Sequence, residues 1–444
     1  MVSSAVDTIV AVATPPGIGA VGVVRLSGRD AVAIADVVAP GVAACPPRRA
    51  SVRRVMDGDV VVDEVVAIVF RGPASFTGED VVELQGHGGA VTLDWIVERC
   101  VDAGARPAEA GEFTRRAVLN GRLDLVRAEA IADVIHARDR AGHRLAQAHL
   151  AGALSRRVDG LKDALVAVLV QLEAAIDFSL EEHVYSVSPS DVADGLAPVF
   201  GGLTALLDGA DDGRLRHDGV RVALTGPPNA GKSTLLNALL GDDRAIVTPI
   251  AGTTRDVVTG EVVVGGIRYV LSDTAGLRET DDPVERIGVE RARSAVDAAD
   301  IVLDVRRAPD GEAPMPAYAC PSVRVWTHVD VQDAPAAPED AVACAVPTGA
   351  GVDALRAALT RLAREAGLRD GGEGAVLTRA RHRAEVRDAH GCVERAIEAA
   401  EAGFEHELIA HDVRLALDAL GRLTGAITSD DVLARVFDGF CIGK

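Results

Sequence analysis

Gly226-Pro227-Pro228-Asn229-Ala230-Gly231-Lys232-Ser233 fits the pattern G-x-x-x-x-G-K-[ST]. The residues before it, Val220 to Thr225, have the composition of a short buried strand, and the apolar run after it indicates a helix that ends at Gly241. A loop between such a strand and helix points backbone N–H groups and a helix N-terminus at one spot, which suits an anion. We therefore predict a phosphate-binding loop, and not a glycine-rich turn that matches by chance. In this loop Lys232 reaches the β- and γ-phosphates, and the Ser233 hydroxyl binds Mg²⁺.

Lysine is rare in this chain. Of 46 Lys and Arg residues, only Lys162, Lys232 and Lys444 are lysine. Arginine presents a planar fork of donors, whereas lysine carries a compact ammonium. A lysine retained in the loop therefore indicates that a compact cation is needed there.

Composition narrows the class of protein. A hydrophobic content of 48% and a charged content of 25% are typical of a globular protein. The formal charge of −20 argues against general nucleic-acid binding. Six scattered cysteines without a C-x-x-C pair favour reduced thiols. Because the sequence shows neither a secretory signal nor an apolar stretch of ~20 residues, we expect a cytoplasmic protein without a membrane span.

One local basic patch remains an alternative to a solvated helix face, and it consists of Arg379, Arg381, Arg383 and Arg387.

The order of apolar patterns predicts a multidomain α/β and α+β protein. β-rich runs at 8–13, 20–26, 60–70 and 81–84, with helices near 30–37 and 90–103, indicate an α+β domain. An apolar stripe from Val158 to Ile176 repeats every three or four residues and indicates a long bundle helix. The same spacing returns at 379–402 and 409–420, whereas the polar run 208–219 is expected to be a linker.

The region between the two helical parts alternates between strand and helix patterns, which predicts a mostly parallel, doubly wound sheet. This nucleotide domain is therefore inserted into a helical domain. The predicted ranges are 1–122 for the N-terminal α+β domain, 123–217 for the first helical part, 218–370 for the inserted P-loop domain and 371–444 for the second helical part.

Two further motifs follow the loop in the order typical of a Ras-like GTPase. The first is Gly252-Thr253-Thr254-Arg255-Asp256, in a loop suited to a switch, where a threonine hydroxyl, assigned to Thr254, completes the Mg²⁺ shell. The second is Asp273-Thr274-Ala275-Gly276 at a strand end, where the aspartate holds Mg²⁺ through water and the glycine N–H approaches the γ-phosphate. Leu277 then stands where water-orienting enzymes carry glutamine, so hydrolysis is either slow or depends on another residue.

The base-reading motif departs from Asn-Lys-x-Asp and reads Thr327-His328-Val329-Asp330. Asp330 still accepts hydrogen bonds from the guanine N1–H and N2 amino groups. Thr327 is shorter than asparagine, and His328 replaces the lysine stem. The N–H of Val346 is expected to meet the guanine O6. We expect GTP to be preferred over ATP, with an affinity several-fold lower than the full motif would give.

Together with the chain ends, these motifs closely resemble the tRNA uridine-5-carboxymethylaminomethyl modification GTPases, the MnmE (TrmE) family, over nearly the whole chain. The family-specific parts are Asp7-Thr-Ile-Val-Ala-Val-Ala-Thr-Pro-Pro-Gly17 with Val21-Gly22-Val-Val-Arg25, Ser75-Phe-Thr-Gly-Glu-Asp80, Glu83-Leu-Gln-Gly-His-Gly-Gly89, Gly111 to Leu125, and Phe440-Cys441-Ile442-Gly443-Lys444.

The resemblance implies an N-terminal domain that dimerises and binds a tetrahydrofolate derivative, 5-formyl or 5,10-methylene. Its folate contacts fall on Arg25, Glu83, Arg122 and Lys444. Cations suit the glutamate tail of folate, and a carboxylate suits the donor edge of a pterin. Each of these residues alone would be interpreted as a solvated surface charge.

The resemblance also implies a potassium ion held by Asn229, the Thr253 side chain and the carbonyls of Thr248 and Ile250. The water-orienting acid of the family falls on Glu285. Cys441 matches its terminal cysteine, with a role open between chemistry and packing. The predicted contacts to GTP are Asn229, Ala230, Gly231, Lys232, Ser233, Thr234, Thr248, Thr253, Thr254, Asp273, Thr274, Ala275, Gly276 and Asp330.

Two functions from different classes follow. The first is an enzyme in which GTP hydrolysis drives addition of a carboxymethylaminomethyl group at C5 of the wobble uridine of certain tRNAs. It needs a flavoprotein partner of the MnmG (GidA) type, in a heterotetramer or a larger complex with the homodimer. The alternative is a ribosome-assembly or signalling-type GTPase switch without one-carbon chemistry. A switch has no use for Arg25, Glu83 and the terminal Cys-Ile-Gly-Lys.

Overall fold

The computed structural model describes residues 7–177, 188–241, 259–273, 293–310, 314–331, 334–369 and 374–427, with Leu433, Val436, Phe437, Phe440 and Gly443. The chain divides into two compact units. The first comprises Met1–Ala132 and Asp418–Lys444, and the second is Asp133–Leu417. Both ends of the sequence therefore belong to one unit. The four predicted domain ranges stay predictions.

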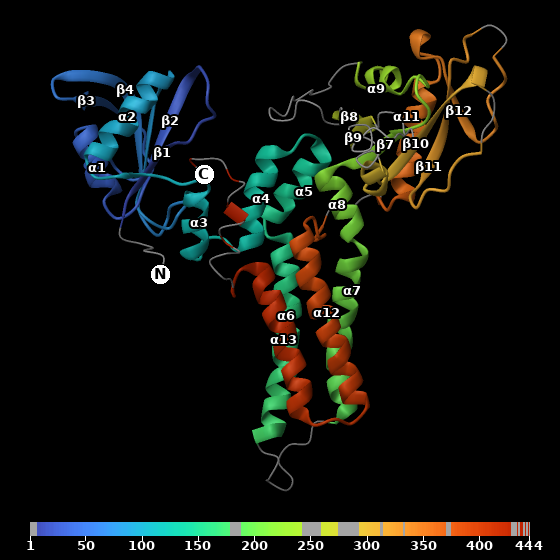
Figure 1. Cartoon of the computed structure of the whole chain (residues 1–444). Helices are drawn as coiled ribbons and strands as arrows, with labels where there is room; N and C mark the ends of the chain where they lie inside the picture. The colour runs from blue at the N-terminus through green and yellow to red at the C-terminus, as the bar shows by residue number, and fades with distance from the viewer. Residues whose placement is uncertain are drawn as a thin grey trace, which may run out of the picture. The chain divides into compact units, whose positions relative to one another are not determined.

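The first unit holds a six-stranded mixed sheet in the order β3-β4-β5-β2-β1-β6 (Figure 1). All its neighbouring strands pair antiparallel except β1 and β6, which pair parallel. The strands are β1 (Ile9–Val12), β2 (Gly19–Ser27), β3 (Ser51–Asp57), β4 (Val60–Phe70), β5 (Val81–Gly88) and β6 (Arg106–Pro107). The helices are α1 (Ala31–Val38), α2 (Ala90–Asp102) and α3 (Glu112–Leu119). The predicted α+β class is confirmed, and sequence reasoning missed β3.

Strand alternation gives the sheet two different faces. Val24 and Leu26 of β2 are fully buried in the core that α1 and α2 complete. Because successive side chains of a strand point to opposite faces, Arg25 between them lies on the other face. There Phe113 of α3 packs against Ile9 and Ala11. The second face therefore carries a charged residue beside a small apolar cluster.

The end of the chain packs within this first unit. Phe437 and Phe440 share an apolar cluster with Leu125 and Ala128. Gly443 has a left-handed backbone, with φ +93°, and a Cβ there would lie 2.2 Å from the Val12 carbonyl oxygen. Only glycine tolerates both conditions. Gly443 therefore lies against Val12, the last residue of β1.

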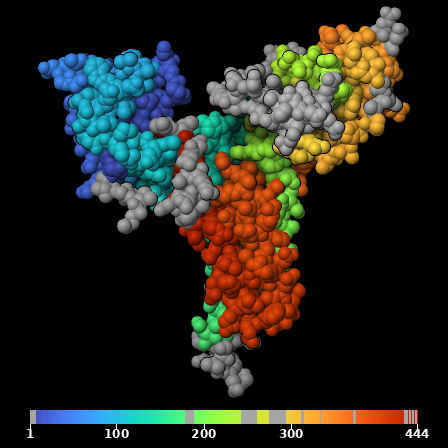
Figure 2. Space-filling model, in the orientation of Figure 1, coloured from blue at the N-terminus to red at the C-terminus, as the bar shows by residue number. Residues whose placement is uncertain are grey.

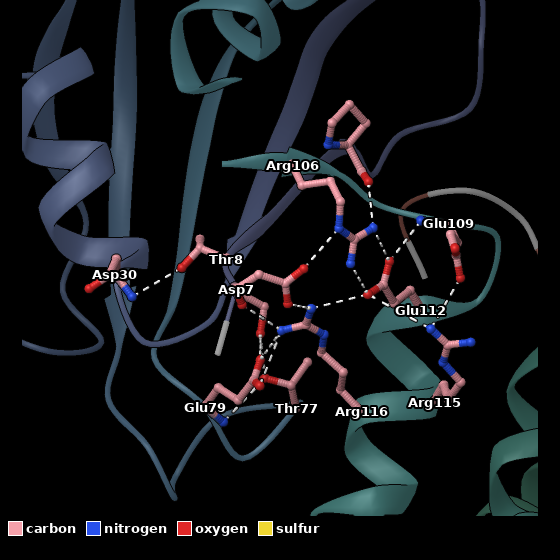
Figure 3. A network of polar contacts seen from close by, with 12 residues as sticks. Asp7, Thr8, Asp30, Thr77, Glu79, Arg106, Glu109, Glu112, Arg115 and Arg116 are labelled. Carbon is pink, nitrogen blue, oxygen red and sulfur yellow. Dashed lines mark hydrogen bonds and ion pairs between the residues drawn. The ribbon is translucent and has the colours of Figure 1, made fainter. Parts of the chain in front are cut away.

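A partly buried ionic network fixes α3 to the start of β1 (Figure 3). Arg116, whose side chain is 10% exposed, donates to the Asp7 carboxylate at 2.7 Å, to Glu112 at 3.0 Å and to Glu79 at 3.2 Å. Arg106 completes the network, since it donates to Glu112 at 2.7 Å and to Asp7 at 2.8 Å. Oε2 of Glu79, which also accepts from Arg116, accepts from the hydroxyl of Ser27, the last residue of β2. The network thus positions the strand that carries Arg25.

These ion pairs outweigh the cost of burial for the carboxylates. Burial acts to raise the pKa of Glu112, but the hydrogen bonds from Arg106, the Glu109 N–H and Arg116 hold it below its ordinary value of 4.5. Burial likewise acts to raise the pKa of Asp7, and Arg106 with Arg116 holds it below 3.8. A carboxyl with a lowered folded-state pKa stabilises the fold above its unfolded pKa. That contribution is lost as the pH falls through the folded-state pKa.

The second unit contains the helical bundle, whose long helices run side by side (Figure 1). Its helices are α5 (Arg140–Leu150), α6 (Ala153–Asp177), α7 (Pro189–Asp208), α8 (Ala210–Asp218) and α12 (Ala380–Glu401). Two more, α4 (Leu125–His136) and α13 (His406–Thr424), cross the division between the units in sequence. The predicted stripe on α6 is buried from Val158 to Leu172, and α12 and α13 match the two later helical patterns. In Figure 2 the residues of α12 and the segment after it form a continuous orange and red surface.

The predicted linker at 208–219 is wrong, because most of it forms α8. Asp211 and Asp212 occupy its first turn, and Arg216 and His217 its last. Acidic residues at the N-terminus and basic residues at the C-terminus complement the helix dipole. Arg216 also donates to Asp212 one turn earlier at 3.0 Å. Charge order, which the polar composition hid, makes this stretch helical.

The nucleotide domain of the second unit is built on a sheet in the order β12-β11-β10-β7-β9-β8. All pairs are parallel except β8 with β9, as the sequence predicts. The strands are β7 (Val220–Thr225), β8 (Thr259–Val264), β9 (Ile267–Asp273), β10 (Ile301–Arg307), β11 (Ser322–Thr327) and β12 (Ala341–Cys344). Helices α9 (Lys232–Leu240) and α11 (Val352–Glu365) contribute leucines to its core. In the part of the chain that the structure describes, no helix is long and apolar enough to cross a membrane.

Arg116→Leu should destabilise the first unit by about 3 kcal/mol at pH 7, because it removes the cation shared by Asp7, Glu79 and the buried Glu112 and leaves Arg106 to pair with Asp7 and Glu112. The difference from wild type should shrink below about pH 4.5, where the variant can protonate its carboxylates. Hydrogen exchange of the β1 and β6 amides measures both effects.

The matched control for this experiment is Arg115→Leu on the same helix. Arg115 pairs mainly with Glu109, whose side chain is 66% exposed, at 3.1 Å. It should cost less than about 1 kcal/mol. Equal effects of the two variants would contradict the assigned role of Arg116.

Candidate functional site

The loop 226–231 between β7 and α9 has the geometry of a phosphate-binding loop. Gly226 has φ +137°, and a Cβ there would lie 2.1 Å from the Val305 carbonyl oxygen of β10. Gly231, with φ +88°, precedes the first residue of α9. The exposed Asn229 also has a left-handed backbone, with φ 62°. The two glycines are therefore required by close packing and by the turn into the helix.

Lys232 and Ser233 stand at the start of α9, where an anion is favoured. The Lys232 ammonium donates to the carbonyls of Gly226 and Pro227 at 2.9 Å each. Burial lowers the pKa of Lys232, an effect that the charge of Asp273 opposes. The ammonium is thus held inside the loop, close to where phosphate oxygens would replace the two carbonyls. Thr234 follows on the same helix and is exposed.

Two of the residues predicted around Mg²⁺, Ser233 and Asp273, meet where β9 ends. Ser233 donates to the Asp273 carboxylate, with an oxygen–oxygen distance of 2.6 Å. Among the described residues, nothing bonds to the buried second oxygen of Asp273. A hydroxyl and a carboxylate with a spare oxygen are the hard ligands that Mg²⁺ prefers. The residues present therefore fit this ion.

Several predicted site residues lie outside the described residues. They are Thr248, Ile250, Thr253, Thr254, Thr274, Ala275, Gly276, Glu285, Cys441 and Lys444. Of the predicted potassium ligands, only Asn229 is described. The potassium site and the water-orienting acid accordingly stay predictions.

The base-reading segment follows β11, and its first residue has a contact that sequence reasoning missed. Thr327 is buried, with 1% of the residue exposed. Its hydroxyl donates to the Ala230 carbonyl of the phosphate loop at 2.7 Å. The Arg306 carbonyl of β10 is also within reach at 3.0 Å. Thr327 therefore fastens the phosphate loop to two neighbouring strand ends. Sequence reasoning missed this contact because it compared Thr327 with asparagine only by the length of the side chain.

His328 and Asp330 continue the segment at the surface of the domain. His328 has φ 56°, and its ring lies 3.3 Å from where a Cβ on Gly231 would stand. Asp330 is exposed. Val346 opens a short 3₁₀ helix, Val346–Thr348, after β12. These positions leave Asp330 free of the core, as a base-reading carboxylate must be.

The structure brings two of the four residues predicted for the one-carbon site, Arg25 and Glu83, into direct contact. Arg25 and Glu83 are directly paired in the β2–β5 register, and their side chains bond at 2.9 and 3.0 Å. Arg25 additionally donates to the Gly443 carbonyl at 3.3 Å, and its guanidinium lies 5.8 Å from the Phe113 ring centre. The residue next to Lys444 is therefore in contact with Arg25.

Arg122 joins this region through the loop Ser75–Asp80. A Cβ on Gly78 would lie 3.3 Å from the Arg122 side chain, so this side chain packs on the loop. Phe76 of the same loop has its ring centre 6.0 Å from the Arg25 guanidinium. Asn120 donates to the Thr77 carbonyl at 2.7 Å and holds the loop in place. Arg122 thus packs against Gly78, two residues after Phe76, whose ring Arg25 approaches.

Comparisons with known proteins now bear on both sites. Residues 8–122 match the model of the GTP-binding protein TrmE N-terminus, and residues 125–441 match that of the MnmE helical domain. A tRNA modification GTPase MnmE of Xanthomonas euvesicatoria is 45% identical over 454 residues, with 100% of each chain covered. The chain belongs to the MnmE family of tRNA modification GTPases.

The family relation is not confined to one genus. The MnmE protein of Neisseria meningitidis serogroup C is 42% identical over 455 residues, again covering 100% of both chains. A crystal structure of Era in complex with MgGDPNP and nucleotides 1506-1542 of 16S ribosomal RNA shares 28% identity over 32% of this chain and 56% of its own, with a TM-score of 0.28. The assignment rests on the sequence relatives and the two family models.

Thr327→Val should weaken GTP binding by about threefold to tenfold, since it removes one hydrogen bond from the phosphate loop without changing the side-chain shape. Thr327→Ser keeps the hydroxyl and serves as the matched control. The ratio of GTP to ATP affinity should stay unchanged, because Asp330 is untouched. Titration with a fluorescent guanine nucleotide measures all three. Wild-type affinity in the valine variant would show that the contact does not support the loop.

Proposed function

We propose that this chain hydrolyses GTP to drive addition of a carboxymethylaminomethyl group at C5 of the wobble uridine of certain tRNAs. The observation that carries the proposal is full-length similarity to tRNA modification GTPases combined with a complete phosphate loop. We place the protein in the cytoplasm, where tRNA and GTP are available.

The nucleotide site performs phosphoryl transfer mainly by positioning and charge stabilisation. Lys232 would exchange its two loop carbonyls for β- and γ-phosphate oxygens. Ser233, Asp273 and Thr254 would hold Mg²⁺, which neutralises charge on those phosphates when bound. Glu285 would orient the attacking water, because Leu277 cannot. Asn229, Thr248, Ile250 and Thr253 would hold K⁺ beside the phosphates.

The region around Arg25 is proposed to bind the one-carbon donor, 5-formyl- or 5,10-methylenetetrahydrofolate. The pair Arg25–Glu83 is support for this, since it offers a cation and a carboxylate on the same sheet face. Arg25 also donates to the carbonyl of Gly443, the residue before Lys444, and we propose Lys444 and Arg122 as further cations of the site. The alternative, a GTPase switch without one-carbon chemistry, leaves this convergence of both chain ends unexplained.

The proposed assembly is a homodimer that associates with a flavoprotein of the MnmG (GidA) type and with tRNA, as a heterotetramer or larger. Exposed apolar side chains on the first unit support self-association: Ile18 is 98% exposed and Val91 is 78% exposed. Ile18 directly precedes Gly19, and Val91 follows Gly88 by three residues, where Gly19 and Gly88 pair in the sheet. Exposed apolar patches of this kind mark interaction surfaces.

Truncation of Ile442–Lys444 should abolish binding of tetrahydrofolate derivatives and leave GTP affinity intact, because the proposed folate contacts include Lys444 and the proposed GTP contacts do not. Lys444→Ala tests the same point without removing the packed Gly443. Quenching of Trp95 fluorescence by the folate, or a rise in melting temperature, reports binding. Unchanged folate binding in both variants would favour the switch.

Hydrolysis should slow at least about tenfold when Na⁺ replaces K⁺ at equal ionic strength, which corresponds to about 1.4 kcal/mol of barrier. Glu285→Ala should slow turnover without weakening GTP binding. Single-turnover phosphate release measures both rates. Equal rates in the two salts would eliminate the potassium mechanism for this protein.

A further inference from the structure

A cavity of about 410 Å³ lies in the second unit, where the chain passes from the helical bundle into the nucleotide domain and back. It is bordered by the end of α8, the start of β7 and the start of α12. Its walls are Ala210, Arg214, His217, Asp218, Arg221, Leu377, Thr378, Arg379, Ala380 and Arg383. The phosphate loop does not contribute to it, so it is separate from the GTP site.

Cationic side chains dominate the walls. Five of them line the cavity, four arginines and His217, against one carboxylate, Asp218. His217 is bonded to Asp133 at 2.9 Å and Asp218 at 2.8 Å, which raises its pKa to about 9 and keeps it charged at neutral pH. Each arginine pairs with an aspartate: Arg214 with Asp300, Arg221 with Asp218, Arg379 with Asp133 and Arg383 with Asp211. Of these four aspartates, Asp218 alone is among the residues that line the cavity. Four aspartates thus face five cations, and the balance inside the cavity is positive.

Two buried polar atoms at the cavity are left without partners among the described residues. One is the hydroxyl oxygen of Thr378, a residue that is 4% exposed, and the other is the Nε of Arg379. Buried polar groups in folded proteins nearly always have a partner. Two adjacent orphans in a basic cavity therefore point to an oxyanion that accepts from both.

The start of α12 adds to the same preference. This helix of 22 residues begins at Ala380, and the side chain of its N-cap residue, Arg379, makes no capping hydrogen bond. The positive dipole end of a long helix favours an anion. Guanidinium forks match the oxygens of a phosphate group.

We propose that this cavity binds a phosphate group, either inorganic phosphate or a phosphate of an RNA backbone, independently of the GTP site. The Thr378 hydroxyl and Arg379 Nε donate to it, and Arg221 approaches from the nucleotide domain. Arg221 has the longest pair of the four arginines, at 3.5 Å, and a half-exposed side chain, so it can turn to the anion at little cost. The bound group would then link the segment entering the nucleotide domain to the helix that follows it.

The test uses the full chain with its phosphate loop saturated by GDP and Mg²⁺, so that added phosphate cannot bind there. Calorimetric titration with inorganic phosphate, against chloride at matched ionic strength, should show saturable binding. Thr378→Val and Arg221→Gln should each weaken it by about tenfold or more, as expected for lost hydrogen bonds to a charged group. Arg361→Gln is the control, because Arg361 is a 60% exposed surface arginine paired with Glu365. It should leave phosphate binding unchanged.

Titration of the same variants with tRNA distinguishes the two sources of phosphate. A parallel loss of tRNA affinity, with a salt slope smaller by about one, assigns the site to RNA. Weaker binding of phosphate alone assigns it to the free anion. Absence of saturable binding to the wild-type protein, or equal losses in all three variants, would overturn the proposal. Unchanged melting temperatures without phosphate confirm that the variants are folded.

Discussion

The nucleotide site depends on how closely the phosphate loop packs against two neighbouring strand ends. Gly226 leaves no room for a Cβ against the Val305 carbonyl, and the Thr327 hydroxyl bonds to the Ala230 carbonyl. Both contacts require β10 and β11 to follow β7 in the sheet, which is the observed order. The parallel arrangement therefore does more than support the loop. It sets the loop conformation in which Lys232 and Ser233 begin a helix aimed at phosphate.

The one-carbon region depends on a different constraint, the return of the chain end to the first unit. Gly443 passes so close to Val12 that only glycine fits, and its carbonyl accepts from Arg25. The ionic network around Arg116 holds Asp7 at the start of β1, whereas Gly443 contacts Val12 at its end (Figure 3). A site of this kind is assembled only after the intervening helices and nucleotide domain have been made. Its assembly therefore requires that the whole chain has been synthesised.

Ion pairs tie together the two segments that connect the nucleotide domain to the bundle. The Asp212 carboxylate of α8 accepts from the Arg369 N–H, which follows α11, at 2.9 Å. The Asp133 carboxylate, near the end of α4, is bonded both to His217, before β7, and to Arg379, after the nucleotide domain. Burial acts to raise the pKa of Asp133, but His217 and Arg379 hold it below its ordinary value. The insertion is thus clamped by charge, and a ligand anion at this clamp would act on both connections together.

The sequence by itself determined the elements and the chemistry of the loop. Apolar spacing located α6, α12 and α13, and the run Gly226 to Ser233 specified a phosphate site, because period and local motif are properties of adjacent residues. Resemblance to a family also singled out Arg25 and Glu83, although composition alone would make them surface charges. Polar composition failed for α8, where charge order along the dipole mattered more. Tertiary structure alone decided that Thr327 fastens the loop, that Gly443 meets Arg25 and that five cations surround one cavity. These contacts join residues from about one hundred to more than four hundred positions apart, and no local pattern encodes such pairings.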